Sequence, residues 1–271
     1  MAKIAELLCY PIKGCAGTSL VDSVVTPAGL AHDRGFMVVA EDGVFRTQRR
    51  HPRLALVRPE MSTDGERMTL RAPGAEALTI DVDSTGPKQD VELFGKPFKG
   101  IDQGPAVAEW LSGFLGAASR LVRVPPDHDR VTDGLTPGTS GYADSCAVLV
   151  ISRPSLDLLN EKLATPLPMN RFRPNIVVTG FDEPHAEDRM RRVTSGDVEL
   201  GYAKLATRCA VTTVDQATGT KSGPEPLRTF ASYRRVQAGG VAFGAKFAVV
   251  QPGKVSVGDD FVVHEWGEPE Y

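Results

Sequence analysis

The sequence predicts a mainly β protein with a few helices, organised as β-barrels. Short runs rich in Val, Ile, Thr and Phe recur along its 271 residues. Gly and Pro, with 27 and 20 occurrences, interrupt these runs often and supply the turns between strands. Hydrophobic residues make up 41% of the chain and charged residues 24%. This length and composition allow two cores of roughly 100–150 residues each.

The N-terminal part is expected to hold most of its residues in strands, with one helix. Apolar residues at i, i+3, i+4 and i+7 predict that helix over Ala106–Leu115, because they fall on one face. Alternating apolar and β-branched residues indicate the strands. The predicted strands are Ile4–Tyr10, Phe36–Ala40, Leu54–Arg58, Met68–Arg71, Leu78–Val82, Val91–Phe94 and Leu121–Val124.

A polar passage rich in turn-forming residues, Pro125–Gly141, is the predicted boundary between two domains, 1–120 and 121–271. Beyond it, a strand leads into a helix capped by Ser152, with Pro154 in its first turn. We expect a second barrel-like part there. Its predicted strands are Ala147–Ile151, Ile176–Thr179, Val198–Tyr202, Cys209–Val214, Phe247–Val250 and Phe261–His264.

The charge and hydropathy patterns exclude several classes of protein. The chain has 31 basic and 34 acidic residues, a formal net charge of −3, so no overall positive field attracts nucleic acid. Its first residues lack the apolar core of a signal peptide, and no window approaches the ~18 apolar residues of a membrane span. We therefore expect a cytoplasmic protein with neither nucleic-acid nor membrane partners.

The four cysteines, Cys9, Cys15, Cys146 and Cys209, are scattered without a C-x-x-C pair. Disulfide frameworks, zinc ribbons and iron–sulfur sites need denser spacing. The five histidines never stand at i and i+3 or i+4, so they give no local support for a metal site. The sequence thus predicts no electron relay of its own of the iron–sulfur or covalent-haem type.

Cys209 is the most informative residue. It follows Arg208, and a fixed positive charge beside a thiol favours the thiolate, which binds soft or high-valent metals and attacks electrophiles. The alternative is that Cys209 packs as a small buried hydrophobe, as most free cysteines do. The stretch alone favours this inert interpretation.

Several cations are candidates for an anion site. Lys13 follows a strand and leads into a turn with Gly14 and Gly17, where backbone N–H groups and an ammonium can meet a phosphate. Arg34 lies in a turn directly before a buried strand, where it is either a solvated charge or the partner of Asp33. Each of these signs is weak alone.

Arg173 and Asn175 stand at the mouth of the strand Ile176–Thr179, and Pro174 rules out a helix there. In an extended segment the two side chains would project to one side, so that a guanidinium and an amide act together. Two other charged stretches are interpreted as solvated surface. They are the basic residues Arg46, Arg49, Arg50 and Arg53 and the acidic loop 182–188.

Taken together, these motifs resemble the MOSC family, named for the C-terminal domain of molybdenum cofactor sulfurase. The resemblance covers nearly the whole chain in order, and the closest kind of member is the amidoxime-reducing component with its N-terminal MOSC-associated β-barrel. The motifs that carry it are Tyr10-Pro-Ile-Lys-Gly-Cys15, Asp33-Arg34, Tyr142-Ala-Asp-Ser145, Phe172-Arg-Pro-Asn175, Arg208-Cys-Ala-Val-Thr-Thr-Val-Asp215, Thr218-Gly219 and Pro226-Leu227.

The resemblance implies a molybdenum cofactor, in which a pterin carries the metal, with Cys209 as the metal ligand. Lys13, Arg34, Arg173 and Arg208 would hold the phosphate and pterin. It also implies that the first strands, to about residue 34, belong to the MOSC barrel. Lesser cofactor contacts match Gly14, Ser145, Cys146, Asn175 and Thr207.

The implied activity is reduction of N-hydroxylated small molecules by transfer of the N–O oxygen to molybdenum, with electrons from a separate iron–sulfur, flavin or haem protein. Asp215 would shuttle protons or cap a turn. The chain departs from the family in having Lys246 where a tyrosine contacts the cofactor and Cys146 for the commoner serine or threonine.

Two other roles stay open: a persulfide carrier that uses Cys209, and a barrel that stores the molybdenum cofactor or another flat anionic ligand such as a flavin nucleotide. An association of the wider family with pyridoxal phosphate binding is kept as a further expectation.

Overall fold

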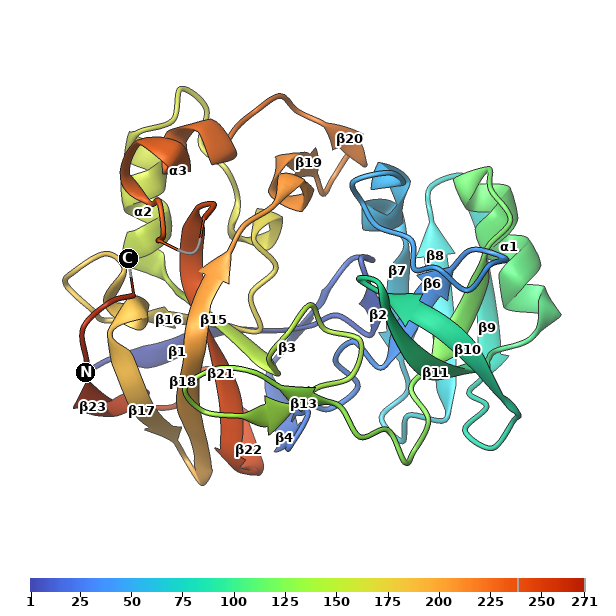
Figure 1. The fold of residues 1–271 in the computed structure, drawn as a ribbon, viewed down its shortest axis with the longest axis horizontal. Coiled ribbons are helices and arrows are strands. Elements are labelled where there is room, and N and C mark those ends of the chain that lie inside the picture. The colour runs from blue at the N-terminus through green and yellow to red at the C-terminus, as the bar shows by residue number, and fades with distance from the viewer. Residues whose placement is uncertain (238, 271) are drawn as a thin grey trace.

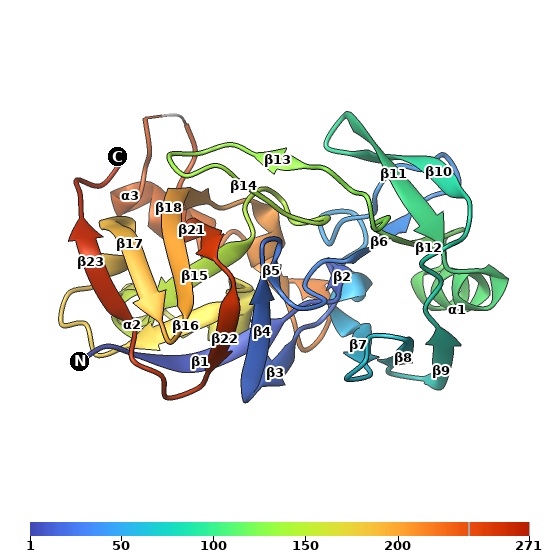
Figure 2. The same cartoon turned by 90° about the horizontal axis from the view of Figure 1, so that it is seen from below.

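The computed structural model describes residues 1–237 and 239–270, and they form a mainly β molecule with two parts (Figure 1). One part contains an eight-stranded curled sheet, and both termini lie on its outer side (Figures 1 and 2). The order of this sheet is β23 (Val262–Trp266), β17 (Met190–Ser195), β18 (Val198–Thr207), β21 (Ala242–Gln251), β15 (Val148–Ser152), β16 (Ile176–Thr179), β1 (Lys3–Cys9) and β3 (Thr18–Leu20).

Two N-terminal strands, β1 and β3, join this sheet, although its other six strands come from residues 148–266. β1 pairs antiparallel with β16 and β3, and β15 and β16 are parallel. This part also contains a second, three-stranded sheet. Its order is β22 (Gly253–Ser256), β4 (Asp22–Thr26) and β5 (Gly29–Leu30). Residues from both sheets, among them Leu7, Val25, Val148 and Phe247, form one buried core.

Two helices cover the other face of the large sheet. They are α2 (Arg153–Glu161) and α3 (Leu227–Tyr233), and they bury Leu156 and Phe230 against Tyr10 and Phe172. Ser152 is the N-cap residue of α2 as predicted, but its hydroxyl contacts Ser155 Oγ at 2.7 Å rather than a backbone N–H. Short 3₁₀ turns occur at Met169–Arg171, Ala186–Asp188 and Ala210–Thr213.

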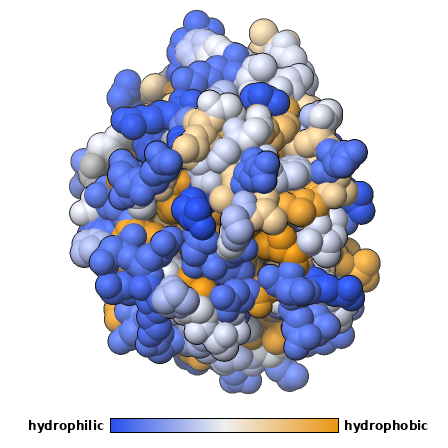
Figure 3. Space-filling view, turned by 90° about the vertical axis from the view of Figure 1, so that its right-hand side faces the viewer, coloured by the Kyte–Doolittle hydropathy of each residue, from blue (hydrophilic) through white to orange (hydrophobic). Residues whose placement is uncertain are grey.

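The second part holds a five-stranded sheet, a three-stranded sheet and one helix. The first runs β10 (Lys88–Leu93), β11 (Lys96–Asp102), β12 (Arg120–Arg123), β6 (Phe36–Val39) and β2 (Ile12–Lys13); the other is β7 (Arg58–Met61), β8 (Arg67–Ala72) and β9 (Ala75–Asp81). Helix α1 (Pro105–Leu115) packs Val107, Leu111 and Phe114 into their common core, as its spacing predicts. Figure 3 faces this end of the molecule and shows a largely hydrophilic surface with apolar patches between.

Two of the predicted strands are wrong. The segment predicted over Leu54–Arg58 is a 3₁₀ turn, Pro52–Leu56, because Pro52 supplies the fixed φ of a first turn. The segment predicted over Cys209–Val214 is mostly the 3₁₀ turn Ala210–Thr213, and only β19 (Val214–Asp215) is extended. The hydroxyls of Thr212 and Thr213 donate to the carbonyls of Cys209 and Ala210 at 2.9 and 2.8 Å, which stabilises the turn against a strand.

The passage 125–141 connects the two parts across one side of the molecule (Figure 2). It contains the two-residue strands β13 (Val131–Thr132) and β14 (Gly138–Thr139), which pair with each other. Another two-stranded sheet is formed by β19 and β20 (Thr220–Lys221), which pair antiparallel. The division into domains at about residue 120 stays a prediction.

Candidate functional site

A cavity of about 810 Å³ lies where the two parts of the molecule meet. The N-terminal part contributes the end of β2, the loop 45–49 and the β10–β11 hairpin; the other part contributes loops 129–133, 143–149 and 172–175 and the segment after β18. The cavity brings together nearly all of the residues predicted to form a site. They are Lys13, Gly14, Arg34, Ser145, Cys146, Arg173, Asn175, Thr207, Arg208 and Cys209.

The cavity is cationic although the chain is slightly acidic. Among the described residues, ten basic and three acidic side chains line it. The formal charge of the chain is −3, so the basic residues are concentrated here. A cavity lined in this way favours an anionic ligand. The basic residues are Lys13, Arg34, Arg46, Arg49, Lys96, Arg130, Arg173, Lys204, Arg208 and Lys246.

The Tyr10 ring contacts two guanidinium groups. The Cζ atoms of Arg34 and Arg173 lie 4.5 and 4.3 Å from its ring centroid. Arg34 has a left-handed backbone with φ of 48° and pairs with Asp33 at 2.6 Å. Burial acts to lower the pKa of Arg34, but the Asp33 carboxylate outweighs it and the pKa is raised. Arg34 is therefore the partner of Asp33, as one of its two interpretations predicted.

Arg173 is buried without such a partner. Its Nη1 donates to the carbonyl of Cys15 at 2.6 Å, and among the described residues no carboxylate oxygen lies within 4.0 Å of its nitrogens. Burial lowers its pKa. The φ of Arg173 is +58°, so the segment is not extended there, and the expectation that Arg173 and Asn175 project together from an extended strand is wrong.

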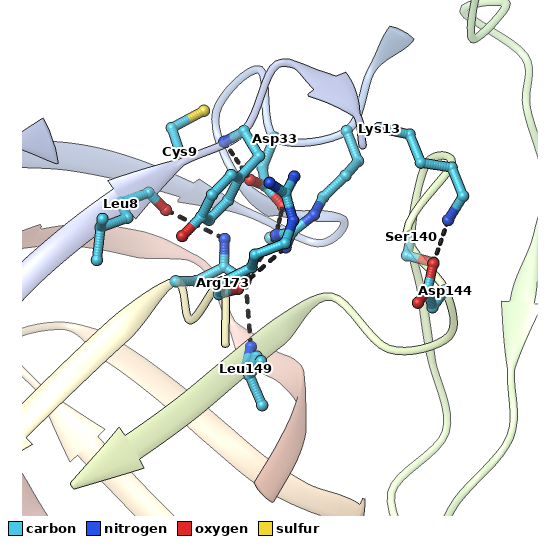
Figure 4. A network of polar contacts seen from close by, with 12 residues as sticks. Leu8, Cys9, Lys13, Asp33, Ser140, Asp144, Leu149 and Arg173 are labelled. Atoms are coloured by element: carbon cyan, nitrogen blue, oxygen red, sulfur yellow. Dashed lines mark hydrogen bonds and ion pairs between the residues drawn. The ribbon is translucent and has the colours of Figure 1, made fainter. Parts of the chain in front are cut away.

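Asn175 borders the cavity, but its amide is engaged inside the protein. Its Oδ1 accepts from Arg34 at 2.9 Å and from the N–H of Leu149 at 3.2 Å, while Nδ2 donates to the carbonyl of Leu8 at 3.2 Å. Asn175 thus holds Arg34 and ties β15 and β1 together. Figure 4 shows this network beside Arg173.

Arg208 and Cys209 follow the end of β18 at Thr207. The guanidinium of Arg208 donates to the carbonyl of Phe172 at 2.6 Å, whereas its buried Nε has no hydrogen-bond partner among the described residues. Burial lowers the pKa of Arg208 to about 10. The Cys209 side chain belongs to an exposed residue at the cavity wall, while the other three cysteines are buried. The interpretation of Cys209 as a small buried hydrophobe is therefore wrong.

A second polar group on the cavity wall combines Ser145, Cys146 and Lys246. Lys246, on β21, donates from Nζ to Ser145 Oγ at 2.7 Å, and burial lowers its pKa. Cys146 is buried, and its thiol donates to the carbonyl of Asp133 at 3.6 Å. Lys246 is thus part of the site rather than a remote departure from the family pattern.

Asp215 does not line the cavity. Its Oδ1 accepts from the N–H groups of Ala217 and Thr218, both at 2.9 Å, and its Oδ2 pairs with Arg171 at 3.0 Å. This is the turn-capping role. The shuttling role has no geometric support, and we do not carry it forward.

Sequence reasoning missed two kinds of cavity residue. Asp144, inside a quoted motif, pairs with Lys13. Phe45, Phe94 and Phe98 form an aromatic side of the cavity that no motif indicated. Phe94-Gly95 between two strands could have indicated a hairpin tip. The basic residues interpreted as solvated surface differ in their positions. Arg46 and Arg49 line the cavity, whereas Arg50 is exposed outside it.

Over residues 1–237 and 239–270, no group of three or more His, Cys, Asp or Glu side chains is placed to hold a metal ion. A metal bound through Cys209 would therefore have to bring its other ligands with it. Within the same residues, the helices are too short or too polar to cross a membrane.

The comparisons with known proteins agree with the arrangement of the chain. The MOSC N-terminal beta barrel domain matches residues 1–118, and the MOSC domain matches residues 137–262. Mitochondrial amidoxime-reducing component 1 of Mus musculus is 35% identical over 277 residues, spanning 94% of this chain and 80% of that protein.

Two further relatives extend the comparison. Mitochondrial amidoxime reducing component 2 of Rattus norvegicus is 37% identical over 278 residues, covering 94% of this chain and 81% of its own. Molybdenum cofactor sulfurase of Danio rerio is 31% identical over 267 residues, covering 90% of this chain but 32% of its own length. With both domains matched in order, the chain belongs to the MOSC family as a molybdenum-cofactor-related protein that carries the MOSC N-terminal β-barrel domain and the MOSC domain.

Proposed function

We propose that this protein binds the molybdenum cofactor in the cavity between its two parts and reduces N-hydroxylated small molecules. The observation that carries the proposal is an exposed thiol, Cys209, on the wall of a cavity where two guanidinium groups, those of Arg173 and Arg208, have no carboxylate partner among the described residues. The names of two relatives, which are amidoxime-reducing components, support the reaction class.

The residues fit an anionic, pterin-sized group. Burying a charge without a partner is costly, so Arg173 and the orphaned Nε of Arg208 favour a bound anion that would neutralise them. A volume of about 810 Å³ lies within the range of cofactor pockets. Cys209 can supply one soft ligand, which suits a metal whose other ligands come from its own organic scaffold.

Each side chain then has a role in binding. Lys13, Arg34, Arg173 and Arg208 would hold phosphate and pterin through charge-assisted hydrogen bonds, in which the planar guanidinium groups form forked pairs. The backbone at Gly14 and the polar atoms of Ser145, Cys146 and Thr207 would provide weaker contacts. Asn175 contributes through Arg34, because its own amide is already satisfied.

When bound, the cofactor supplies two-electron oxygen-atom transfer from an N–O substrate. The chain's part is to present the Cys209 sulfur at the cavity wall, next to the Arg208 cation. Lys246 Nζ holds a proton at the cavity wall, and its lowered pKa makes it the candidate donor for the oxygen that is removed. The β10–β11 hairpin contributes one side of the cavity lining.

Electrons would come from a separate donor protein, and the substrate is a small molecule. A cytoplasmic location stays a prediction; the names of the amidoxime-reducing relatives place those proteins in mitochondria.

The proposal is tested by purifying the protein from a molybdate-supplied host and measuring metal and turnover. We expect about one molybdenum per chain and dithionite-driven reduction of benzamidoxime. A protein without molybdenum would contradict the proposal. Molybdenum without turnover would favour a cofactor carrier.

A persulfide carrier is a second candidate, because Cys209 is exposed and one relative is a molybdenum cofactor sulfurase. Mass spectrometry of the intact chain distinguishes it. An additional sulfur on Cys209, removed by dithiothreitol and present without molybdenum, would support the carrier. No added mass together with stoichiometric molybdenum would exclude it.

A further inference from the structure

Phe94 occupies a backbone conformation that a bulky residue rarely adopts. It is the first residue of the two-residue tip between β10 and β11, where Leu93 pairs with Lys96. Its φ is +54°, and Gly95 follows with a φ of +74°. Tips of this type strongly favour Asn, Asp or Gly at the first position. A phenylalanine there is strained, and such strain is kept where another role requires the side chain.

The Phe94 side chain faces the cavity and remains partly open. It lines the cavity with Phe45 and Phe98, and together these three residues are called the aromatic wall. The rings of Phe45 and Phe94 meet edge to face, with centroids 4.7 Å apart. Phe94 is nevertheless 46% exposed, so its packing against Phe45 leaves much of the ring uncovered.

The aromatic wall differs in chemistry from the rest of the cavity. The thiol of Cys209 and the guanidinium groups without carboxylate partners, Arg173 and Arg208, belong to the other part of the molecule. Lys13 Nζ lies 4.9 Å from the Phe94 ring centroid and also pairs with Asp144 of that other part. A flat aromatic group stacks well on an aromatic side chain.

We propose that the aromatic wall gives the site a preference for substrates whose N-hydroxylated group is carried on an aromatic ring, with Phe94 stacking on that ring. This inference rests on the proposed reductase function. The N–O group points toward Cys209, and the ring lies against the hairpin tip. Phe94 is then a specificity residue that touches substrate.

The test compares two amidoximes that differ only in phenyl against methyl, benzamidoxime and acetamidoxime. Phe94→Asn removes the ring and suits the left-handed backbone, so the hairpin keeps its turn. We expect the ratio of kcat/KM for benzamidoxime to that for acetamidoxime to fall about tenfold, mainly through a higher KM for benzamidoxime. Phe94→Tyr should restore most of the ratio.

Trp266→Leu is the matched control, since Trp266 is also 46% exposed but lies on β23, outside the cavity lining. It should leave the ratio unchanged. An unchanged ratio in Phe94→Asn would overturn the inference, because it would make Phe94 a structural residue of the hairpin only.

A binding measurement separates this failure from failure of the proposed function. If the wild-type protein turns over neither amidoxime, the reductase proposal fails. Calorimetry of benzamidoxime and acetamidoxime binding then still tests whether the aromatic wall prefers a ligand with an aromatic ring. Preferential binding of benzamidoxime that Phe94→Asn abolishes supports the inference. Equal affinity for the two compounds in the wild-type protein contradicts it.

Discussion

The ammonium of Lys13 pairs with the carboxylate of Asp144, and this ion pair joins the two parts of the molecule across the cavity (Figure 4). Lys13 ends β2 in the N-terminal part, and Asp144 precedes β15 in the other. The Lys13 side chain is only 8% exposed, whereas that of Asp144 is 63% exposed. The pair therefore holds a buried cation ready at the position where the proposed anionic ligand would lie.

Asp144→Asn is expected to destabilise the protein by about 1–3 kcal/mol, since it leaves the buried Lys13 ammonium without its anion. Burial already lowers the pKa of Lys13, so the loss should also make Lys13 deprotonate more easily. Urea unfolding of the cofactor-free protein measures the change. The double variant Lys13→Met with Asp144→Asn should recover part of the loss. If the loss of unfolding free energy in the double variant equals the sum of the losses in Asp144→Asn and in Lys13→Met, the two residues are not energetically coupled.

Arg173→Met is expected to affect the cofactor-free and cofactor-bound proteins in opposite directions. Without ligand it removes a buried charge that lies against the Tyr10 ring, and stability should stay the same or rise by about 1–2 kcal/mol. With ligand it removes a forked anion contact, and the bound molybdenum should fall severalfold. Arg173→Lys, which keeps charge without the fork, should be intermediate. Equal molybdenum content in the wild-type, Arg173→Met and Arg173→Lys proteins would show that Arg173 does not contribute to cofactor binding.

Gly17→Ala is expected to disturb the stacked arginines. A Cβ atom at Gly17 would lie 2.4 Å from the Tyr10 ring, and this buried ring contacts both Arg34 and Arg173. Thermal unfolding should show a loss of about 1–3 kcal/mol, accompanied by weaker cofactor retention. Gly113→Ala is the control, because nothing lies within 4 Å of its added Cβ and alanine favours helix. If Gly17→Ala changes neither the thermal unfolding nor the cofactor retention, the Tyr10 ring can move without cost and its position is not fixed.

His185 should make the protein less stable in acid. Burial lowers the pKa of His185 to about 3, with Arg234 adding to the effect, whereas the ordinary value is 6.5. The neutral ring is therefore favoured by folding, and its contribution is complete above about pH 6.5 and declines as the pH falls toward 3. Chemical unfolding at several pH values should show this slope. His185→Asn, which suits the φ of 62°, should flatten it; an equal slope in the variant would assign the pH dependence to other groups.

The sequence predicted the fold wherever a segment's own pattern decides its structure. Helix α1 and strand β16 appear where apolar spacing and β-branched residues place them. Pro52–Leu56 and Ala210–Thr213 were mispredicted, because proline geometry and threonine hydroxyls overrode β propensity. Strand β17 was missed, since its polar, Arg-containing sequence becomes a strand only through pairing with its neighbours β18 and β23.

The candidate site was predictable as a set of residues but not as an arrangement. Motifs indicated the cations and Cys209. Pairing is long-range, and no local pattern shows that Tyr10 contacts both Arg34 and Arg173 or that Lys13 meets Asp144. The aromatic wall is missing from the motifs for the same reason.

The most direct test of the account is X-ray absorption spectroscopy at the molybdenum edge of the wild-type protein and the Cys209→Ser variant, with Cys9→Ser as control because Cys9 is buried and does not line the cavity. We predict that the wild-type and Cys9→Ser proteins share one set of metal–sulfur distances, and that Cys209→Ser loses one sulfur ligand and its amidoxime reduction. An unchanged sulfur coordination in Cys209→Ser, or full turnover by that variant, would contradict the account.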